Sequence, residues 1–204
     1  MLRIRAWFVV ALVLIGLVGP LGPTGTVAAA DCEFPRSWTD ATGTEVTVQA
    51  EPERIVTLSP SASQTMWEIG GRDKVVGLTS YASYLDGYEN RTDVWAETSV
   101  NLEEVIALQP DLVLAPNVIS NETVDQLRQA GLTVYKFDWA TNTEFIIEKT
   151  RLTGRLVGEC DGANDRAASL RSTVQTIREA ASGVDRPLVL YTFFGYTAGE
   201  NTFV

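Results

Sequence analysis

Histidine is absent from this chain of 204 residues. In proteins, histidine is the usual general base, the usual partner of a nucleophilic serine and the commonest metal ligand. Its absence argues against a common serine hydrolase and against a zinc or manganese site. Ser59, Ser61 and Ser63 lie close together in the sequence, but no Gly-x-Ser-x-Gly segment surrounds them. We expect no catalytic residues, no metal ligands and no resident cofactor.

Positive charge is also scarce. The chain has 16 lysines and arginines against 26 aspartates and glutamates, a formal net charge of −10. A chain this acidic repels phosphate backbones, which argues against nucleic-acid binding. Acid-rich, lysine-poor surfaces suit a high-salt environment, where charge repulsion is screened. Ordinary variation in an acidic exported protein explains the same composition equally well.

Long hydrophobic runs are missing except at the N-terminus. Residues 7–18 form an apolar run that is too short to span a bilayer comfortably. Arg3 and Arg5 precede this run, and the small residues 27–30 follow it. We predict that residues 1–30 are a signal peptide and that the protein is exported, to the periplasm or the cell surface. An uncleaved N-terminal anchor is the alternative.

Cysteine occurs only twice, at Cys32 and Cys160. A lipoprotein signal needs a small residue directly before its cysteine. Asp31 precedes Cys32, so we do not expect a lipid there. In an oxidising compartment, a disulfide between the two cysteines is favoured over two free thiols. This bond would tie the mature N-terminus to the chain near residue 160.

Apolar runs alternate with amphipathic segments in the first two thirds of the chain. A short hairpin is expected at residues 39–48. The patterns that follow predict strands at 54–58, 74–78, 111–115 and 132–135, and helices at 62–69, 101–108 and 122–130. This alternation is typical of an α/β fold with a parallel sheet covered on both faces. Ligands of such sheets bind at the carboxyl ends of the strands. The loops expected to matter are therefore 59–63, 79–84, 116–120 and 137–141.

The pattern changes at residue 143. Apolar residues recur at helical spacing up to residue 182, interrupted only around Gly158 to Gly162. A continuous helix of this length would measure roughly 55–60 Å, which suits a backbone helix joining two lobes. We therefore expect an N-terminal α/β ligand-binding lobe at residues 31–142, a long backbone helix at 143–182 and, at 183–204, the start of a C-terminal lobe that is only begun in this chain. Because one strand, at 188–192, cannot bury a core, the sequence is expected to be a fragment or an interrupted gene.

This order of elements resembles the class III, helix-backbone family of ABC-transporter substrate-binding proteins, whose vitamin B12 and ferric-siderophore members are the best known. The segments that carry the resemblance are 40–48, 52–61, 75–81 and 101–114. Any one of them is a weak signal, but all four stand in the family's order and spacing. Residues 195–199 also resemble the family's first loop in the second lobe.

The resemblance implies two lobes that hold a ligand between facing loops. In the vitamin B12 binders, the tyrosine matching Tyr81 stacks against the corrinoid, so Tyr81, with Ser80 beside it, is the first expected contact. Trp95 and Trp139 lie in or next to cleft loops and could add flat apolar walls, although each could equally be a core residue. Pro60 and Ser61 are expected to shape a helix start, whose free N–H groups could bind a polar edge of the ligand.

The resemblance also implies an ABC importer permease as the partner. Glu103 matches a family position whose carboxylate pairs with arginines on the transporter, although an acid favoured by a helix start explains the residue type as well. The expected cargo is a corrinoid such as cobalamin rather than a ferric siderophore, because the expected cleft loops contain no arginine. Contact with the membrane is expected only through the transporter or a missing anchor.

Two functions of other classes remain open: an exported hydrolase-like protein and a surface interaction module of α/β fold. The second predicts no small-molecule affinity and no dependence on Tyr81. The triplets Asn90-Arg91-Thr92 and Asn121-Glu122-Thr123 are glycosylation sequons, plausible on an exported surface but common by chance.

Overall fold

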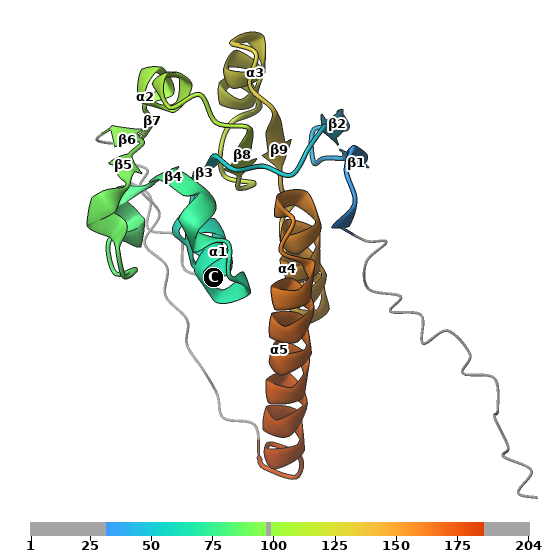
Figure 1. The fold of residues 1–204 in the computed structure, drawn as a ribbon. Helices are drawn as coiled ribbons and strands as arrows, with labels where there is room; N and C mark the ends of the chain where they lie inside the picture. Colours follow the sequence, from blue (N-terminus) through green and yellow to red (C-terminus); the bar gives the residue numbers. More distant parts are fainter. Residues whose placement is uncertain (1–31, 97–98, 186–204) are drawn as a thin grey trace, which may run out of the picture.

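The computed structural model describes residues 32–96 and 99–185, and Figure 1 shows their arrangement. The signal peptide expected at 1–30 and the strand expected at 188–192 lie outside these residues. The strands are β1 (Arg36–Thr39), β2 (Glu45–Val48), β3 (Ile55–Thr57), β4 (Val75–Leu78), β5 (Thr92–Asp93), β6 (Trp95–Ala96), β7 (Ser99–Val100), β8 (Leu112–Ala115) and β9 (Val134–Lys136). The α-helices are α1 (Pro60–Ile69), α2 (Leu102–Ala107), α3 (Asn121–Gln129), α4 (Thr143–Val157) and α5 (Cys160–Ala180). Short 3-10 helices are η2 (Arg72–Lys74), η3 (Ser80–Ala82) and η4 (Tyr88–Asn90).

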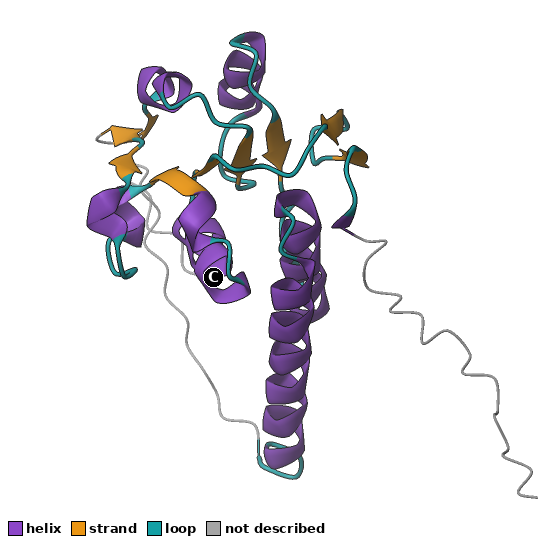
Figure 2. Ribbon diagram, viewed as in Figure 1, coloured by secondary structure: helices purple, strands orange, loops and turns teal. Residues whose placement is uncertain are grey.

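The expected parallel sheet is present. Its strand order is β5-β4-β3-β8-β9, and every neighbouring pair is parallel. The central strands carry apolar side chains on both faces, because helices cover both (Figure 2). One buried cluster includes Met66 of α1 and Leu156 of α4, and the other includes Val105 of α2 and Leu127 of α3. The α/β fold predicted for this part of the chain is confirmed.

The expected hairpin is formed by β1 and β2, and a buried aspartate ties it to the sheet. Asp40, in the turn, accepts hydrogen bonds from Arg128 Nη2 at 2.6 Å and from the Lys136 N–H at 3.0 Å. Burial acts to raise the pKa of Asp40, but hydrogen bonds from Thr42, Lys136 and Arg128 outweigh it and hold the pKa below its ordinary value. The carboxylate therefore joins the hairpin to β9 and α3.

The expectation of one long backbone helix at 143–182 is wrong in its geometry. The chain forms two helices, α4 and α5, which pack side by side (Figure 1). Gly158 adopts the left-handed conformation, with φ +82°, and ends α4, so the chain reverses there. Arg171, in the second half of α5, pairs with Glu144 at the start of α4, so the helices are antiparallel. The 21 residues of α5 extend about 31 Å, not 55–60 Å.

The expected disulfide joins Cys32 to Cys160, whose Cα atoms lie 6.0 Å apart. Cys160 is the first residue of α5, so the bond ties the start of the described chain to the reversal between α4 and α5. It closes a loop of the chain with a sequence separation of 128 residues. The hairpin, the sheet and the two antiparallel helices are thereby linked covalently.

Candidate functional site

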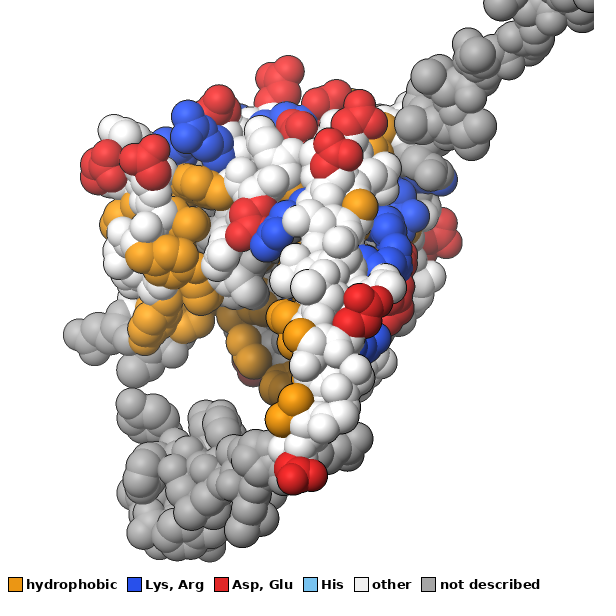
Figure 3. Space-filling view, turned by 90° about the horizontal axis from the view of Figure 1, so that it is seen from below, with side chains coloured by type: hydrophobic (Ala, Val, Ile, Leu, Met, Phe, Trp, Pro, Cys, Tyr) orange, Lys and Arg blue, Asp and Glu red, His pale blue; other side chains and the backbone are white. Residues whose placement is uncertain are grey.

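The carboxyl ends of the parallel strands form one edge of the sheet. Five side chains follow these strand ends in the order of the strands, namely Trp95, Tyr81, Ser61, Asn117 and Trp139. Four inter-strand spacings of about 4.8 Å make this edge roughly 19 Å long. Figure 3, which views the molecule from below, shows a hollow with apolar side chains on its walls.

Tyr81 and Trp95 meet at one end of this edge. Their rings pack edge to face, with centroids 5.8 Å apart and planes at 74°. Asp93 holds the two loops together, because its Oδ1 accepts hydrogen bonds from the N–H groups of Ser80 and Trp95, each at 3.0 Å. Ser80 thus contributes its backbone to the arrangement, and Trp95 is half-buried beneath the more exposed tyrosine.

A pocket of about 350 Å³ lies at the other end of the edge. Its walls come from the start of α1, the loops after β8 and β9, and one face of α4. The lining residues are Ser61, Thr65, Asn117, Trp139, Ala140, Ile146, Lys149 and Thr150. Trp139 is 62% exposed and is therefore not a core residue. The structure thus places Trp139 and Ser61 at one pocket.

The edge exposes large aromatic side chains to solvent. Tyr81 is 63% exposed and Tyr84 is 62% exposed, in addition to Trp139. The hydroxyl of Tyr84 donates to Gln64 Oε1 of α1 at 3.1 Å, which fixes the ring beside the helix. Exposed aromatic rings gathered on one surface make it a candidate binding site, because large exposed apolar patches are uncommon on proteins.

Pro60 and Ser61 form the start of α1, as expected. Ser59 caps the helix, because its Oγ accepts a hydrogen bond from the Ala62 N–H at 3.2 Å, and Pro60 occupies the first turn, where no N–H partner is needed. Pro60 is half-buried, whereas Ser61 is exposed and lines the pocket. The proline shapes the helix start, and the serine faces the site.

Lys149 is the one cation among the residues that line this pocket. Its Nζ lies 4.6 Å from the centroid of the Phe137 ring, a cation–π contact. Burial lowers the pKa of Lys149 from its ordinary value, because the charged form loses solvation. Lys149 therefore presents its positive charge to the Phe137 ring at the wall of the pocket rather than as an exposed group.

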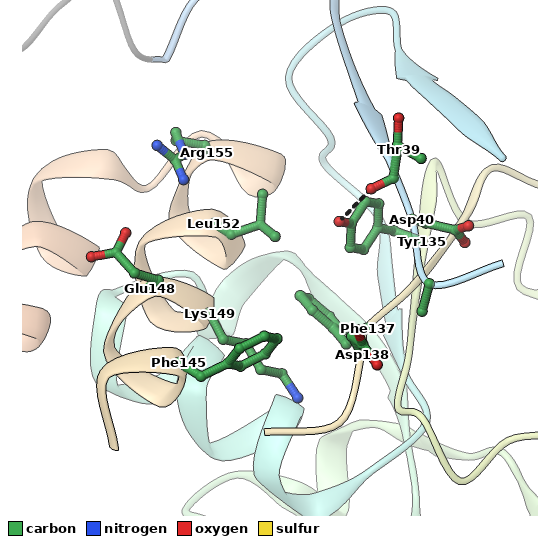
Figure 4. A pocket seen from close by; sticks show the side chains of 11 residues that line it. Thr39, Asp40, Tyr135, Phe137, Asp138, Phe145, Glu148, Lys149, Leu152 and Arg155 are labelled. Atoms are coloured by element: carbon green, nitrogen blue, oxygen red, sulfur yellow. Dashed lines mark hydrogen bonds between the residues drawn. The ribbon is translucent and has the colours of Figure 1, made fainter. Parts of the chain in front are cut away.

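A second pocket, of about 310 Å³, shares Lys149 with the first (Figure 4). It separates the hairpin and β9 from α4, and its floor is apolar, with Tyr135, Phe137 and Phe145. Tyr135 donates its hydroxyl to the Thr39 carbonyl at 3.3 Å, and burial raises its pKa.

Glu103 lies in the first turn of α2 and is exposed. It lines neither of the two pockets described above. The described residues contain no group of three or more cysteines, aspartates and glutamates placed to hold a metal ion. Within the same ranges, none of the helices combines the length and apolar character needed to cross a membrane.

Sequence reasoning missed several residues of the site. It did not identify Asp93, whose two-residue strand β5 has no periodicity to reveal it. It also missed Ile146, Lys149 and Thr150, because α4 was interpreted as part of a connecting helix rather than as a wall of the pocket. The signal for α4 was available in its position directly after a strand-end loop, 137–141.

Comparison with known proteins gives consistent matches. The sequence profile of a family described as "Periplasmic binding protein" matches residues 55–204. A cobalamin-binding protein of Halobacterium salinarum is 44% identical over 203 residues, which cover 95% of this chain and 55% of that protein. The uncharacterized ABC transporter substrate-binding lipoprotein YvrC of Bacillus subtilis is 30% identical over 210 residues, covering 98% of this chain and 67% of that protein.

Solved structures share the fold. The heme-binding protein HmuT superposes with a TM-score of 0.64 and 25% identity, covering 85% of this chain and 56% of that one. The periplasmic vitamin B12 binding protein BtuF of Vibrio cholerae gives a TM-score of 0.59 and 23% identity, covering 65% and 52%. The chain spans about half the length of the cobalamin-binding proteins it matches. With the family profile matching about three quarters of the sequence, the chain belongs to the periplasmic binding protein family.

Proposed function

We propose that this chain is part of an extracytoplasmic solute-binding protein that delivers a corrinoid, such as cobalamin, to an ABC importer. The observation that carries the proposal is the exposure of aromatic residues at the strand edge, with Tyr81 and Tyr84 after β4 and Trp139 after β9. The family match and the 44% identity to a cobalamin-binding protein support it.

The edge suits a large, flat and mostly apolar ligand. Aromatic faces contribute large contact areas and stack on planar ring systems. The part of the edge from β4 to β9, three spacings or roughly 14 Å, accommodates such a ligand, with Tyr81 and Trp139 as its contacts and Ser61 and Ser80 near its polar groups. The proposal includes a second lobe, whose loops face this edge and complete the cleft.

A corrinoid fits this half of the cleft better than an anionic iron chelate. An anionic chelate needs exposed cations for charge pairing, and no arginine lines the pocket that holds Trp139. Its one cation, Lys149, is partly buried and lies against the Phe137 ring. The corrinoid is a cargo in this account and not a resident cofactor.

Glu103 is proposed as a docking residue for the permease. It is exposed and lies outside both pockets, so its carboxylate is free to pair with arginines on a partner. Glu103→Arg should lower cobalamin import by cells and leave cobalamin binding unchanged. Glu122→Arg, at an exposed position of α3, is the matched control and should affect neither.

The proposal makes the chain a binding protein rather than an enzyme. The hydroxyl of Ser61, the serine that faces the pocket, lies 3.2 Å from the hydroxyl of Ser59, and a serine hydroxyl is not a general base. Hydrolysis of simple esters that is lost in Ser61→Ala would support a hydrolase instead.

The test is a fluorescence titration of the chain expressed with any coding sequence that follows its Val204 codon. Cobalamin should quench tryptophan fluorescence at micromolar or lower concentration. A response to ferric hydroxamates without a response to cobalamin would show that the cargo is an iron chelate rather than a corrinoid, bound at the same site. No response to any small molecule would favour a surface interaction module.

A further inference from the structure

The sequence contains two Asn-x-Thr sequons, at Asn90 and at Asn121. In an exported protein, such a triplet accepts an N-linked glycan where it lies in an accessible surface loop. The triplet alone is a weak signal. The two sequons differ, however, in how the fold uses their side chains.

Asn90 is exposed and is the last residue of η4. Its Nδ2 makes only a long contact of 3.4 Å, to Glu89 Oε1, at the limit for a hydrogen bond. The next residue, Arg91, is extended, with φ −120° and ψ 151°, and leads into Thr92 at the start of β5. The amide nitrogen that a glycan would join is therefore available in a surface turn.

Asn121 is used by the fold instead. It is the first residue of α3, and its Oδ1 accepts a hydrogen bond from the buried Lys136 Nζ at 2.5 Å. Its threonine, Thr123, shares a hydrogen bond of 2.9 Å with the hydroxyl of Ser120, the residue that caps α3. Both contacts hold the triplet in the first turn of α3, so it does not lie in an accessible surface loop.

Asn90 also lies away from the proposed cleft. Thr92 pairs with Gly77, so residues before Thr92 run back toward the amino end of β4. Arg91 confirms this placement, because its Nη2 donates to the carbonyl of Arg72 in η2, directly before β4. A glycan at Asn90 would project from the end of the sheet where the strands begin, opposite to the carboxyl ends that carry Tyr81.

We propose that Asn90 is N-glycosylated and that Asn121 is not. The inference rests on the export that the proposed function requires. A lipid-phosphate-linked oligosaccharide is the donor. A bond forms between Asn90 Nδ2 and C1 of the first sugar, the bond from C1 to the phosphate oxygen breaks, and one amide proton leaves with the lipid phosphate. The glycan would cover an exposed turn and leave the strand edge open to ligand.

The test is peptide mass mapping of the protein purified from the host that encodes it, from the fraction outside the cytoplasm. The peptide with Asn90 should be heavier by a chain of sugar residues. This added mass should disappear in Asn90→Gln and in Thr92→Ala, and it should remain in Thr92→Ser and in the matched variant Asn121→Gln. The peptide with Asn121 should have its unmodified mass.

The outcomes separate this inference from the proposed function. Protein recovered outside the cytoplasm with an unmodified Asn90, or with sugar on Asn121, would overturn the glycan assignment alone. Protein found only in the cytoplasm would overturn export and, with it, both proposals. Cobalamin titration of Asn90→Gln should match that of the wild type, since the residue lies away from the cleft.

Discussion

The ring of Tyr81 meets the ring of Trp95 edge to face, with 5.8 Å between their centroids. Aromatic pairs prefer this geometry, because the positive edge of one ring meets the negative face of the other. The contact holds Tyr81 from one side while 63% of the residue remains exposed. The Tyr81 ring is therefore already oriented without a ligand.

Tyr81→Ala should weaken cobalamin binding about tenfold or more, because the stacking surface and the contact with Trp95 are both lost. Tyr81→Phe keeps the ring and should bind within about threefold of the wild type. Isothermal titration measures both. Ile177→Ala, an exposed apolar residue at the far end of α5, is the control. Equal cobalamin affinity for Tyr81→Ala and wild type would show that Tyr81 is not part of the binding site.

Asp93→Ala should weaken binding without unfolding the protein. The change removes the acceptor of two backbone N–H groups, those of Ser80 and Trp95, and so frees the two loops that carry the aromatic pair. The expected loss of stability is about 1–2 kcal/mol, measured by urea unfolding. Asp93→Asn keeps a carbonyl oxygen and should retain most of the affinity. Wild-type binding by Asp93→Ala would show that the loops are held by other contacts.

The elements that the sequence predicted are those with a strong local signal. The strands at Val75–Leu78 and Leu112–Ala115 are apolar runs, and α1, expected at 62–69, spans Pro60–Ile69. The reversal at Gly158 was only partly predicted. Glycine signals an interruption, but whether the chain continues or folds back depends on the packing of α4 against α5, which is a tertiary contact.

The candidate site was predicted in outline only. Tyr81 and Trp95 are neighbours because β4 pairs with β5. The strand β5 has only two residues and no sequence signature. The α4 wall of the pocket depends on the same helix reversal. Aromatic residues in strand-end loops could therefore be predicted from the sequence as site residues, whereas the residues that hold them in place could not.

Arg128→Met should destabilise the protein by about 3 kcal/mol, because it leaves the carboxylate of Asp40 buried without its charge partner. The pKa of Asp40 is held below its ordinary value of 3.8. The contribution of the Asp40 carboxylate to the free energy of unfolding is thus present above pH 3.8. It is lost as the pH falls through the lower pKa of the folded state.

The pH dependence offers a separate check on Asp40. Unfolding free energies of wild type and Asp40→Asn, measured by urea unfolding from pH 6 downward, should converge below about pH 3.8, because the asparagine cannot titrate. Parallel curves over this range would contradict the role given to the carboxylate.

Gly162→Ala should destabilise the packing of α5 against α1. A Cβ at this position would lie 2.0 Å from the Ile69 carbonyl oxygen, so the helices must move apart. The expected cost is about 1–3 kcal/mol in thermal or urea unfolding. In an uncrowded helix, glycine to alanine stabilises by about 1 kcal/mol, so the sign of the change is informative. Ser172→Ala, on the exposed part of α5, is the control.

The central claim is that the ligand binds at the carboxyl edge of the sheet. Hydrogen–deuterium exchange with and without cobalamin tests it most directly, because the amide exchange rate of each loop is measured separately. The account predicts slower exchange at residues 59–63, 79–84 and 137–141 and no change at the turn of residues 39–44. Protection confined to that turn and to the face of α4 near Arg155 would place the ligand in the second pocket and contradict the account.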